Sequence, residues 1–259
     1  MEILQALPSD PFTYVIIYFA LILFGISKSG FGGGLGALSV LLILQVLSVY
    51  QTIGLLLPIL CLMDIFSMIA YKRNFDVKNL KLLGVPCLVG IIVGSFLIDS
   101  LDKELIKLMI GILALLFTLD YFVSSSFKRQ KRDFKHSKLQ AGIWGSLAGF
   151  SSMIAHSGGP PANFYLLPQK MDKKIFVGTT VYLFAIINYT KLIPYIQLNI
   201  IGIESLMFSL IVLPTAPIGI YLGIYLQKKF TSYYFYLLCY GALFLTGLKL
   251  LYEGLTHYI

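Results

Sequence analysis

Long apolar stretches of the sequence contain or directly adjoin Lys28, Asp64, His156 and Lys191. A charged side chain at the centre of a membrane span costs about 2.5 to 3.5 kcal/mol on insertion scales, so intramembrane charge indicates a function by default. Lysine supplies positive charge to an anion, whereas aspartate and histidine can carry a proton, histidine near neutral pH. These residue types indicate anion binding, with Asp64 and His156 as candidates for proton coupling.

The first of these residues stands in a glycine-rich segment between two apolar runs. Residues 27–36, here named the first break, read Ser-Lys-Ser-Gly-Phe-Gly-Gly-Gly-Leu-Gly. Glycines expose backbone N–H groups where the next helix begins, and helix N-termini attract anions. The substrate-binding residues predicted in this break are Ser27, Lys28, Gly32, Gly33 and Gly34. Two alternatives stay open: Lys28 snorkels from the end of its segment, and the glycines only allow close helix packing.

A second interruption has a similar character. Residues 155–163, here named the second break, read Ala-His-Ser-Gly-Gly-Pro-Pro-Ala-Asn. They again combine small residues, hydrogen-bond donors and a helix start. The substrate-binding residues predicted here are Ser157, Gly158, Gly159 and Asn163, beside the proton carrier His156. The alternative for His156 is a structural residue held by hydrogen bonds.

A third group of polar residues lies on two long apolar segments. Asp64 is deep within the apolar run 52–71, and Asn188 precedes Lys191 by three positions, on one face of a helix. We expect Asn188 and Lys191 to bind the substrate and Asp64 to carry a proton. The alternatives are an ion pair between Asp64 and a lysine that holds the two halves together, and a Lys191 that snorkels to the interface.

The composition shows which elements must position these residues. The 259-residue chain is 58% apolar and 12% charged, against about 45–50% and about 25% in soluble domains. These values exclude an ordinary soluble enzyme and a disordered chain. Continuous apolar runs near helical span length predict an all-α, polytopic membrane protein. The runs are 12–27, 35–49, 52–71, 82–98, 104–123, 139–155, 175–195, 203–226 and 232–252.

The order of these segments repeats along the chain. A shift of 124 residues pairs Gly25 with Gly149, Ser27 with Ser151, Asp64 with Asn188 and Tyr71 with Tyr195, and a shift of 129 pairs Gly90 with Gly219 and Gly94 with Gly223. Each half reads as a broken, re-entrant-like helix hairpin followed by three transmembrane helices. The predicted units are a first repeat over 1–127, a basic cytoplasmic linker over 128–138 and a second repeat over 139–259. The spaced glycine pairs indicate close helix packing.

Loop charge gives the two halves opposite orientations. In the first half the connection 72–81 is basic and 99–103 is acidic, whereas in the second half 196–202 is uncharged and 228–229 is basic. Because Lys and Arg stay cytoplasmic, this bias predicts an inverted repeat with both termini outside. The net charge of +8 then reflects topology, and we expect no nucleic-acid partner.

Other chemistries find little support in the sequence. Residues 30–36 have neither the preceding strand nor the Gly-Lys-Ser/Thr ending of a nucleotide-binding loop. The cysteines lack metal-ligand spacing, so we expect neither a metal nor a cofactor; they are Cys61, Cys87 and Cys239. Deep carboxylates and histidines are too few for an intramembrane enzyme, so no enzymatic activity is expected.

The two breaks together resemble those of the TauE/SafE family of sulfite exporters, over nearly the whole chain. The matching residues are Gly25 to Gly34 in the first half and, in the second, Gly149-Phe150-Ser151, Ala155 to Pro160, Gly178-Thr179, Asn188 and Lys191. One departure is a second proline, Pro161, after the glycines. The resemblance implies a transporter of small sulfur-containing anions such as sulfite, sulfonates or sulfoacetate, driven by an ion gradient.

Residues and resemblance together predict a secondary active transporter of a small sulfur-containing anion. We expect proton coupling and alternating access around a site at the membrane midplane, between the two breaks. The partners would be the anion, the proton and membrane lipid, and the location the cell (inner) membrane, which the chain crosses several times. The alternative is a passive anion channel, which would share the positive site without needing a proton carrier.

Overall fold

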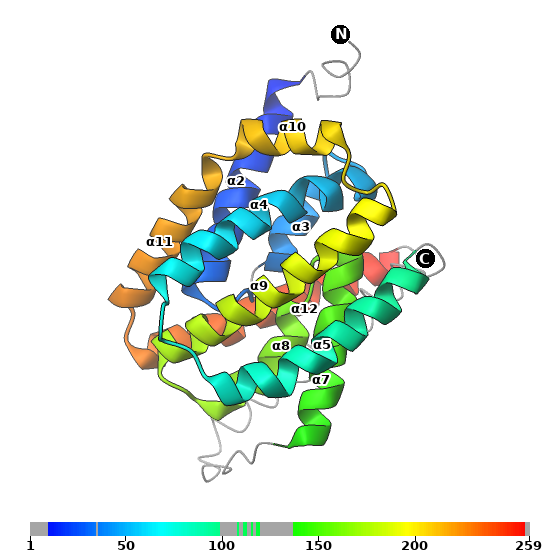
Figure 1. Ribbon diagram of the computed structural model, residues 1–259. Helices are drawn as coiled ribbons and strands as arrows, with labels where there is room; N and C mark the ends of the chain where they lie inside the picture. The colour runs from blue at the N-terminus through cyan, green and yellow to red at the C-terminus, as the bar shows by residue number, and fades with distance from the viewer. Residues whose placement is uncertain are drawn as a thin grey trace.

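The computed structural model describes residues 10–34, 36–98 and 137–256, with a few further positions between 108 and 119. The described part of the chain is built from helices (Figure 1), which confirms the all-α prediction. The elements are α2 (Pro11–Gly30), α3 (Gly36–Leu44), α4 (Val49–Ala70), α5 (Val77–Leu97), α7 (Lys138–Ala155), α8 (Gly159–Leu166), the 3-10 helix η1 (Leu167–Gln169), α9 (Lys173–Gln197), α10 (Ile203–Val212), α11 (Thr215–Lys229) and α12 (Ser232–Thr256).

Among the described residues, five helices are long and apolar enough to cross a membrane. They lie in α2, α4, α5, α9 and α12. The run 203–226, expected as one helix, is instead the pair α10 and α11, bent by 51°. Pro214 stands at the bend, and proline removes a backbone donor and crowds the preceding turn. Counted as one broken span, this pair gives a sixth crossing, and the chain is a multi-pass membrane protein.

Local sequence signals explain where several helices begin. Asp10 accepts a hydrogen bond from the backbone N–H of Phe12, with Pro11 in the first turn of α2. Ser48 and Gln51 form a capping box at the start of α4. Asp76 caps α5 and Asp172 caps α9 through their carboxylates. Each cap satisfies backbone donors that a helix start otherwise leaves unpaired.

Each break separates two helices, here named its arms: a long helix before the break and a short helix after it. In the first half the arms are α2 and α3, and in the second they are α7 and α8, with η1 continuing from α8. The returning helices α3 and α8 have nine and eight residues, or about 12 to 14 Å at 1.5 Å per residue. Because the hydrocarbon core is about 30 Å thick, neither returning helix alone crosses it.

Helices of the first half of the sequence pack against helices of the second half. Helix α11 packs along α2, and α5 packs along α7 (Figure 1). A Cβ on Gly25 would lie 2.8 Å from the Cα of Gly219, and a Cβ on Gly149 would meet the carbonyl oxygen of Cys87. Both helix pairs therefore touch backbone to backbone, as the glycine spacing predicts. Gly90, one of the spaced glycines, likewise approaches the backbone of Ser146.

The described residues form two large hydrophobic cores and a third, small cluster of Leu41, Ile154 and Leu250. One core is formed by buried residues of α2, α3, α4, α10 and α11. The other contains residues of α5, α7, α8, α9 and α12, together with Ile53, Leu57 and Cys61 from a second face of α4. Helices α4 and α9 pack against each other at the centre, so the two cores meet along this pair. Each core thus combines helices from both halves of the sequence.

Several basic helix ends lie at one end of the molecule. Lys173 at the start of α9 donates to the carbonyls of Gln227 and Phe230 at the end of α11, at 2.9 and 2.5 Å. The N–H of Asp76, which caps α5, donates to the hydroxyl of Thr179 on α9 at 2.9 Å. These contacts bring the connection 72–81 and residues 228–229 to the same end, consistent with a shared cytoplasmic side. The loop 99–103 and nearly all of the linker 128–138 and the run 104–123 lie outside the described residues.

Candidate functional site

The two breaks turn the chain with the same backbone geometry. Gly32 and Gly33 have φ values of 64° and 77°, and His156 has a φ of 49°. Such left-handed conformations suit glycine and are uncommon for a histidine. The N–H of Gly33 donates to the carbonyl of Ser27 at 2.9 Å, and the N–H of Ser157 donates to that of Ser151 at 3.2 Å. Both hydrogen bonds close a helix end in the same way.

The breaks also meet in space. A Cβ on Gly159 would collide with the carbonyl of Gly33, so the close approach requires glycine. The side-chain amide of Asn163 donates to the carbonyl of Gly32 at 3.3 Å. Polar residues far apart in the sequence, from the two predicted repeats, therefore share one buried region.

An ion pair and a hydrogen bond join the long helices beside this region. Lys28 on α2 lies 2.8 Å from Oδ1 of Asp64 on α4, and Asn188 on α9 donates to Oδ2 of Asp64 at 2.8 Å. Lys28 is 3% exposed and Asp64 is 0% exposed, so Lys28 does not snorkel to the surface. The ion pair lies within the first half, whereas the Asn188 contact crosses between halves.

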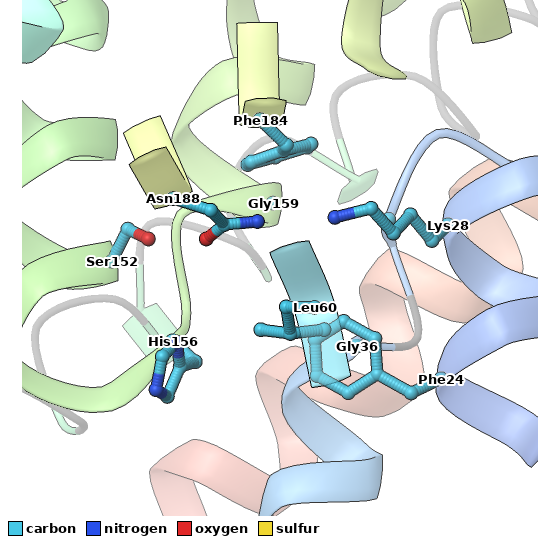
Figure 2. A pocket seen from close by; sticks show the side chains of 10 residues that line it. Phe24, Lys28, Gly36, Leu60, Ser152, His156, Gly159, Phe184 and Asn188 are labelled. Carbon is cyan, nitrogen blue, oxygen red and sulfur yellow. The ribbon is translucent and has the colours of Figure 1, made fainter. Parts of the chain in front are cut away.

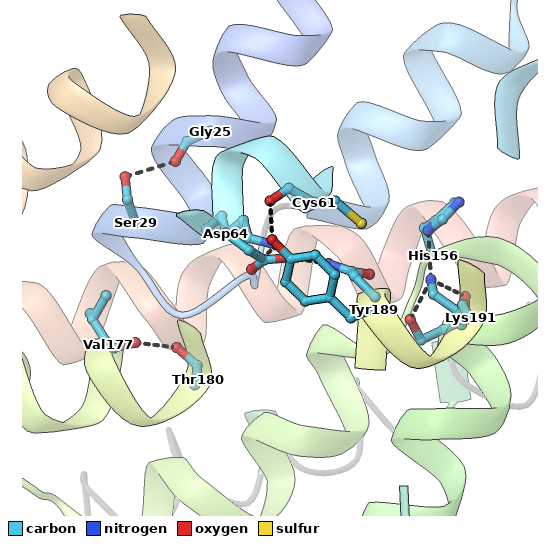
Figure 3. A network of polar contacts seen from close by, with 12 residues as sticks. Gly25, Ser29, Cys61, Asp64, His156, Val177, Thr180, Tyr189 and Lys191 are labelled. Atoms are coloured by element: carbon cyan, nitrogen blue, oxygen red, sulfur yellow. Dashed lines mark hydrogen bonds and ion pairs between the residues drawn. The ribbon is translucent and has the colours of Figure 1, made fainter. Parts of the chain in front are cut away.

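Lys191 occupies a second polar cluster, shown in Figure 3. Its side chain is fully buried, and its ammonium donates to the carbonyl and hydroxyl of Ser152, each at 3.0 Å. It also lies 2.8 Å from Nδ1 of His156, whose Nε2 lies 3.2 Å from the carbonyl of Ile53. An ammonium only donates, so Nδ1 accepts and Nε2 carries the hydrogen that reaches Ile53. With Lys191 as an ammonium, these contacts leave His156 neutral, and they place Lys191 away from any surface.

The interior charge is not balanced among the described residues. The buried charged side chains are Lys28, Asp64 and Lys191. With His156 neutral, two positive charges face one carboxylate, which leaves one positive charge in excess. Buried charges are ordinarily paired because desolvation is costly. An unbalanced ammonium deep in a membrane protein is therefore a candidate to bind an anion.

A cavity of about 20 Å³ lies between the two breaks, with room for about one water molecule. The predicted residues that line it are Lys28, Gly33, His156, Gly159 and Asn188. Figure 2 shows the Lys28 ammonium and the Asn188 amide nitrogen pointing toward each other, and both contact the carboxylate of Asp64. Lys28 also lies 5.9 Å from the ring centroid of Phe184, near enough for a cation–π contact.

Sequence reasoning missed the other half of the lining, which is Phe24, Gly36, Leu60, Ser152 and Phe184. A signal for some of these residues was present in the repeat. The shift of 124 pairs Lys28 with Ser152 and Leu60 with Phe184. Serine and leucine are unremarkable within apolar runs, so residue type alone did not single them out.

The remaining predicted residues lie in the two breaks or on α4 and α9 and do not line the cavity. The carbonyl of Gly34 accepts from the hydroxyl of Thr246 at 3.0 Å, and the hydroxyl of Ser157 donates to the carbonyl of Ala155 at 3.1 Å. The residues outside the lining are Ser27, Gly32, Gly34, Ser157, Gly158, Asn163, Asp64 and Lys191. Asp64 and Lys191 nevertheless contact lining residues directly.

Two tyrosines form hydrogen bonds to the ends of the long arms, at positions related by the sequence repeat. The hydroxyl of Tyr71 donates to the carbonyl of Ser29, and the hydroxyl of Tyr195 donates to the carbonyl of Met153, both at 2.6 Å. Each pair is 42 residues apart, and the two pairs are related by the shift of 124. The sequence matched the tyrosines to each other without indicating this role.

Comparison with known proteins gives one match. A family model described as "Sulfite exporter TauE/SafE" matches residues 14–250. No curated protein and no solved structure matches the chain. The matched range includes both breaks and every residue that lines the cavity.

Proposed function

Because the chain belongs to the sulfite exporter TauE/SafE family, we propose that it is a secondary active transporter whose substrate, a small sulfur-containing anion, binds where the two breaks meet. The observation that carries this proposal is the excess positive charge among the described buried residues, where Lys28 and Lys191 face the carboxylate of Asp64. A singly charged anion in the adjoining cavity would neutralise that charge. Hydrogen sulfite and a simple sulfonate carry that single charge, whereas sulfite and a sulfoacetate-like compound carry two and would be neutralised together with the coupled proton.

The groups around the cavity suit an oxyanion. Lys28 is an ammonium with three N–H groups, of which one is directed to Asp64. Asn188 offers an amide, and Gly33 and Gly159 bring backbone close to the cavity. The helix starts at α3 and α8 adjoin the same space and favour negative charge there.

Proton coupling is proposed at Asp64 or His156, because each holds a lysine in place. A proton on Asp64 would weaken its hold on Lys28 and Asn188. A proton on Nδ1 of His156 would displace the N–H of Lys191 that now points there. In either case protonation changes the charge or the donors presented to the anion, which is what coupling requires.

Alternating access is proposed because the cavity is smaller than the substrate. A space for about one water molecule has to widen before it admits a sulfur oxyanion. The two cores, which meet along α4 and α9, supply bodies that can move relative to each other. The packing between the two halves and the matching turns support an inverted repeat around this site. We place the protein in the cell (inner) membrane.

Ligand-induced thermal stabilisation of the purified protein tests the substrate class. A ligand that binds the folded state raises the melting temperature as its concentration exceeds Kd. We expect stabilisation by sulfite or a sulfonate, in a panel with sulfate, thiosulfate, sulfoacetate and taurine. Stabilisation by none of the sulfur anions would contradict the proposal.

A further inference from the structure

We propose that Ser152 binds the transported anion directly and that Lys191 acts through Ser152 rather than touching the anion; this inference rests on the proposed function. Ser152 lies on α7, shortly before the second break, and its side chain lines the cavity. Lys191 does not line the cavity. The two residues therefore differ in position as well as in charge.

Lys191 has no hydrogen left for a substrate. Its ammonium has three N–H groups and three acceptors: the carbonyl of Ser152, the hydroxyl of Ser152 and Nδ1 of His156. All three distances lie between 2.8 and 3.0 Å, which is the usual range for N–H···O and N–H···N bonds. Direct binding of an anion by Lys191 would break one of these bonds.

Ser152 still has a donor to offer. A hydroxyl carries one hydrogen and two lone pairs, and Ser152 Oγ accepts from Lys191. Within the described part of the chain, Lys191 is the one hydrogen-bond partner recorded for this oxygen. Ser152 is only 3% exposed, and Figure 2 shows its oxygen pointing toward Asn188 at the cavity. A buried hydroxyl whose hydrogen lacks an acceptor is suited to an incoming oxyanion.

The position of Ser152 relative to Lys28 supports the same assignment. The two residues are 124 positions apart, on the long arms α2 and α7, and both line the cavity. An anion between them would meet an ammonium on one side and a hydroxyl on the other. The hydroxyl is polarised by Lys191, which strengthens it as a donor. Because Ser152 brings no charge of its own, we expect a singly charged oxyanion to bind better than a doubly charged one.

Calorimetric titration of the purified protein with sulfite tests the role of Ser152. We expect Ser152→Ala to weaken binding at least about tenfold, the usual effect of losing a hydrogen bond to a charged group. Ser152→Thr keeps the hydroxyl and should stay within about threefold of the wild type. Thr190→Ala is the matched control, because that hydroxyl bonds back to Ile186 on the partly exposed side of α9.

The outcomes separate this inference from the function on which it rests. Wild-type affinity in Ser152→Ala would overturn the assignment of Ser152 and leave the proposed function standing. A wild-type protein that binds neither sulfite nor a sulfonate would overturn both. Equal losses in Ser152→Ala and Ser152→Thr would also contradict a role for the hydroxyl.

Crystals of the wild-type protein soaked with selenite give a test that needs no variant. Selenite has the shape and charge of sulfite, and selenium is located by its anomalous scattering. We expect its oxygen atoms within hydrogen-bond distance of Ser152 Oγ and Lys28 Nζ. Selenite bound to Lys191 Nζ, with Ser152 not engaged, would overturn the inference.

Discussion

Lys191 lies in the interior with three hydrogen-bond acceptors around its ammonium. Within the described residues no carboxylate lies within ion-pair distance of it, because Asp64 pairs with Lys28. Burying a charge without a counter-charge costs free energy that hydrogen bonds only partly offset. Stability and anion binding therefore place opposite demands on this residue.

We expect Lys191→Met to keep or raise the melting temperature while weakening sulfite binding at least about tenfold. Methionine is one heavy atom shorter than lysine, fills most of the same space and removes the desolvated charge. Lys249→Met on α12 is the control, because Lys249 is 42% exposed and pairs with Glu253 one turn away. Thermal unfolding and titration with sulfite measure the two effects. A variant that binds sulfite normally would show that the charge of Lys191 plays no part in the site.

Asp64, unlike Lys191, has a counter-charge: it pairs with Lys28 and also accepts a hydrogen bond from Asn188. We expect Asp64→Asn to destabilise the protein by about 3 to 5 kcal/mol, since Lys28 is then left buried without a counter-charge. The double variant Lys28→Met with Asp64→Asn should regain most of that stability, without regaining sulfite binding. Denaturant titration in detergent measures the stability of each variant. Equal stability of the single and double variants would contradict the ion pair.

At the residue scale, the sequence identified the buried charges but not their partners. Lys28, Asp64, His156 and Lys191 stood out because charge is rare in apolar runs. Which lysine pairs with Asp64 depends on how α2, α4 and α9 cross, and spacing along one chain does not contain that information. Ser152 was missed for a different reason, since a serine within an apolar run is common.

Close contact between α5 and α7 depends on residues without side chains. A Cβ on Gly149 would meet the carbonyl of Cys87, and a Cβ on Gly90 would meet the carbonyl of Ser146. A backbone carbonyl cannot turn away as a flexible side chain can. The position of α7, and with it Ser152 and His156, therefore depends on these glycines.

We expect Gly149→Ala to lower the melting temperature and to weaken sulfite binding, because α5 and α7 must separate. Gly142→Ala on the same helix is the control, because nothing lies within 4 Å of a Cβ at that position. It should stabilise the protein by about 0.5 to 1 kcal/mol through helix propensity. Thermal unfolding of the two variants separates a steric effect from a general effect of alanine. A Gly149→Ala variant as stable as the wild type would contradict the close contact.

At the element scale, length and hydropathy were sufficient for most helices. The runs 52–71 and 175–195 correspond to α4 and α9, with boundaries shifted by a few residues. The prediction of a single helix over 203–226 was wrong, because a hydropathy average that includes Pro214 does not detect a bend. The length of α3 could not be predicted, because Val46 and Leu47 continue the apolar run beyond its end, whereas Pro168 and the polar residues after it follow the end of α8 closely.

The two hydrophobic cores do not coincide with the two halves of the sequence. Each core takes its long arm from one half and a neighbouring helix from the other, α11 beside α2 and α5 beside α7. Gly25 and Gly149 meet the backbone of the neighbouring helix in these pairs, whereas Asp64 and Asn188 join α4 to α9 by side chains. The inverted repeat, predicted from order and charge, stays a prediction that these contacts support.

Membrane topology can be measured from thiol labelling in sealed vesicles. Lys72→Cys and Lys229→Cys should react with an impermeant maleimide from the same, cytoplasmic side, and Gly202→Cys only from the other. The three native cysteines are buried, so background labelling should be low. Gly202 tolerates a side chain because nothing lies within 4 Å of its Cβ position. Labelling of all three positions from one side would contradict the proposed orientation.

Transport of radioactive sulfite into proteoliposomes tests the central claim most directly. Uptake should saturate with sulfite concentration, should be accelerated by an imposed pH gradient, and should be lost in Lys28→Met. These results together require a binding site, a coupled proton and the buried ammonium. Sulfite flux that rises linearly with concentration and does not change with the pH gradient would indicate a channel. The absence of flux would contradict transport of sulfite.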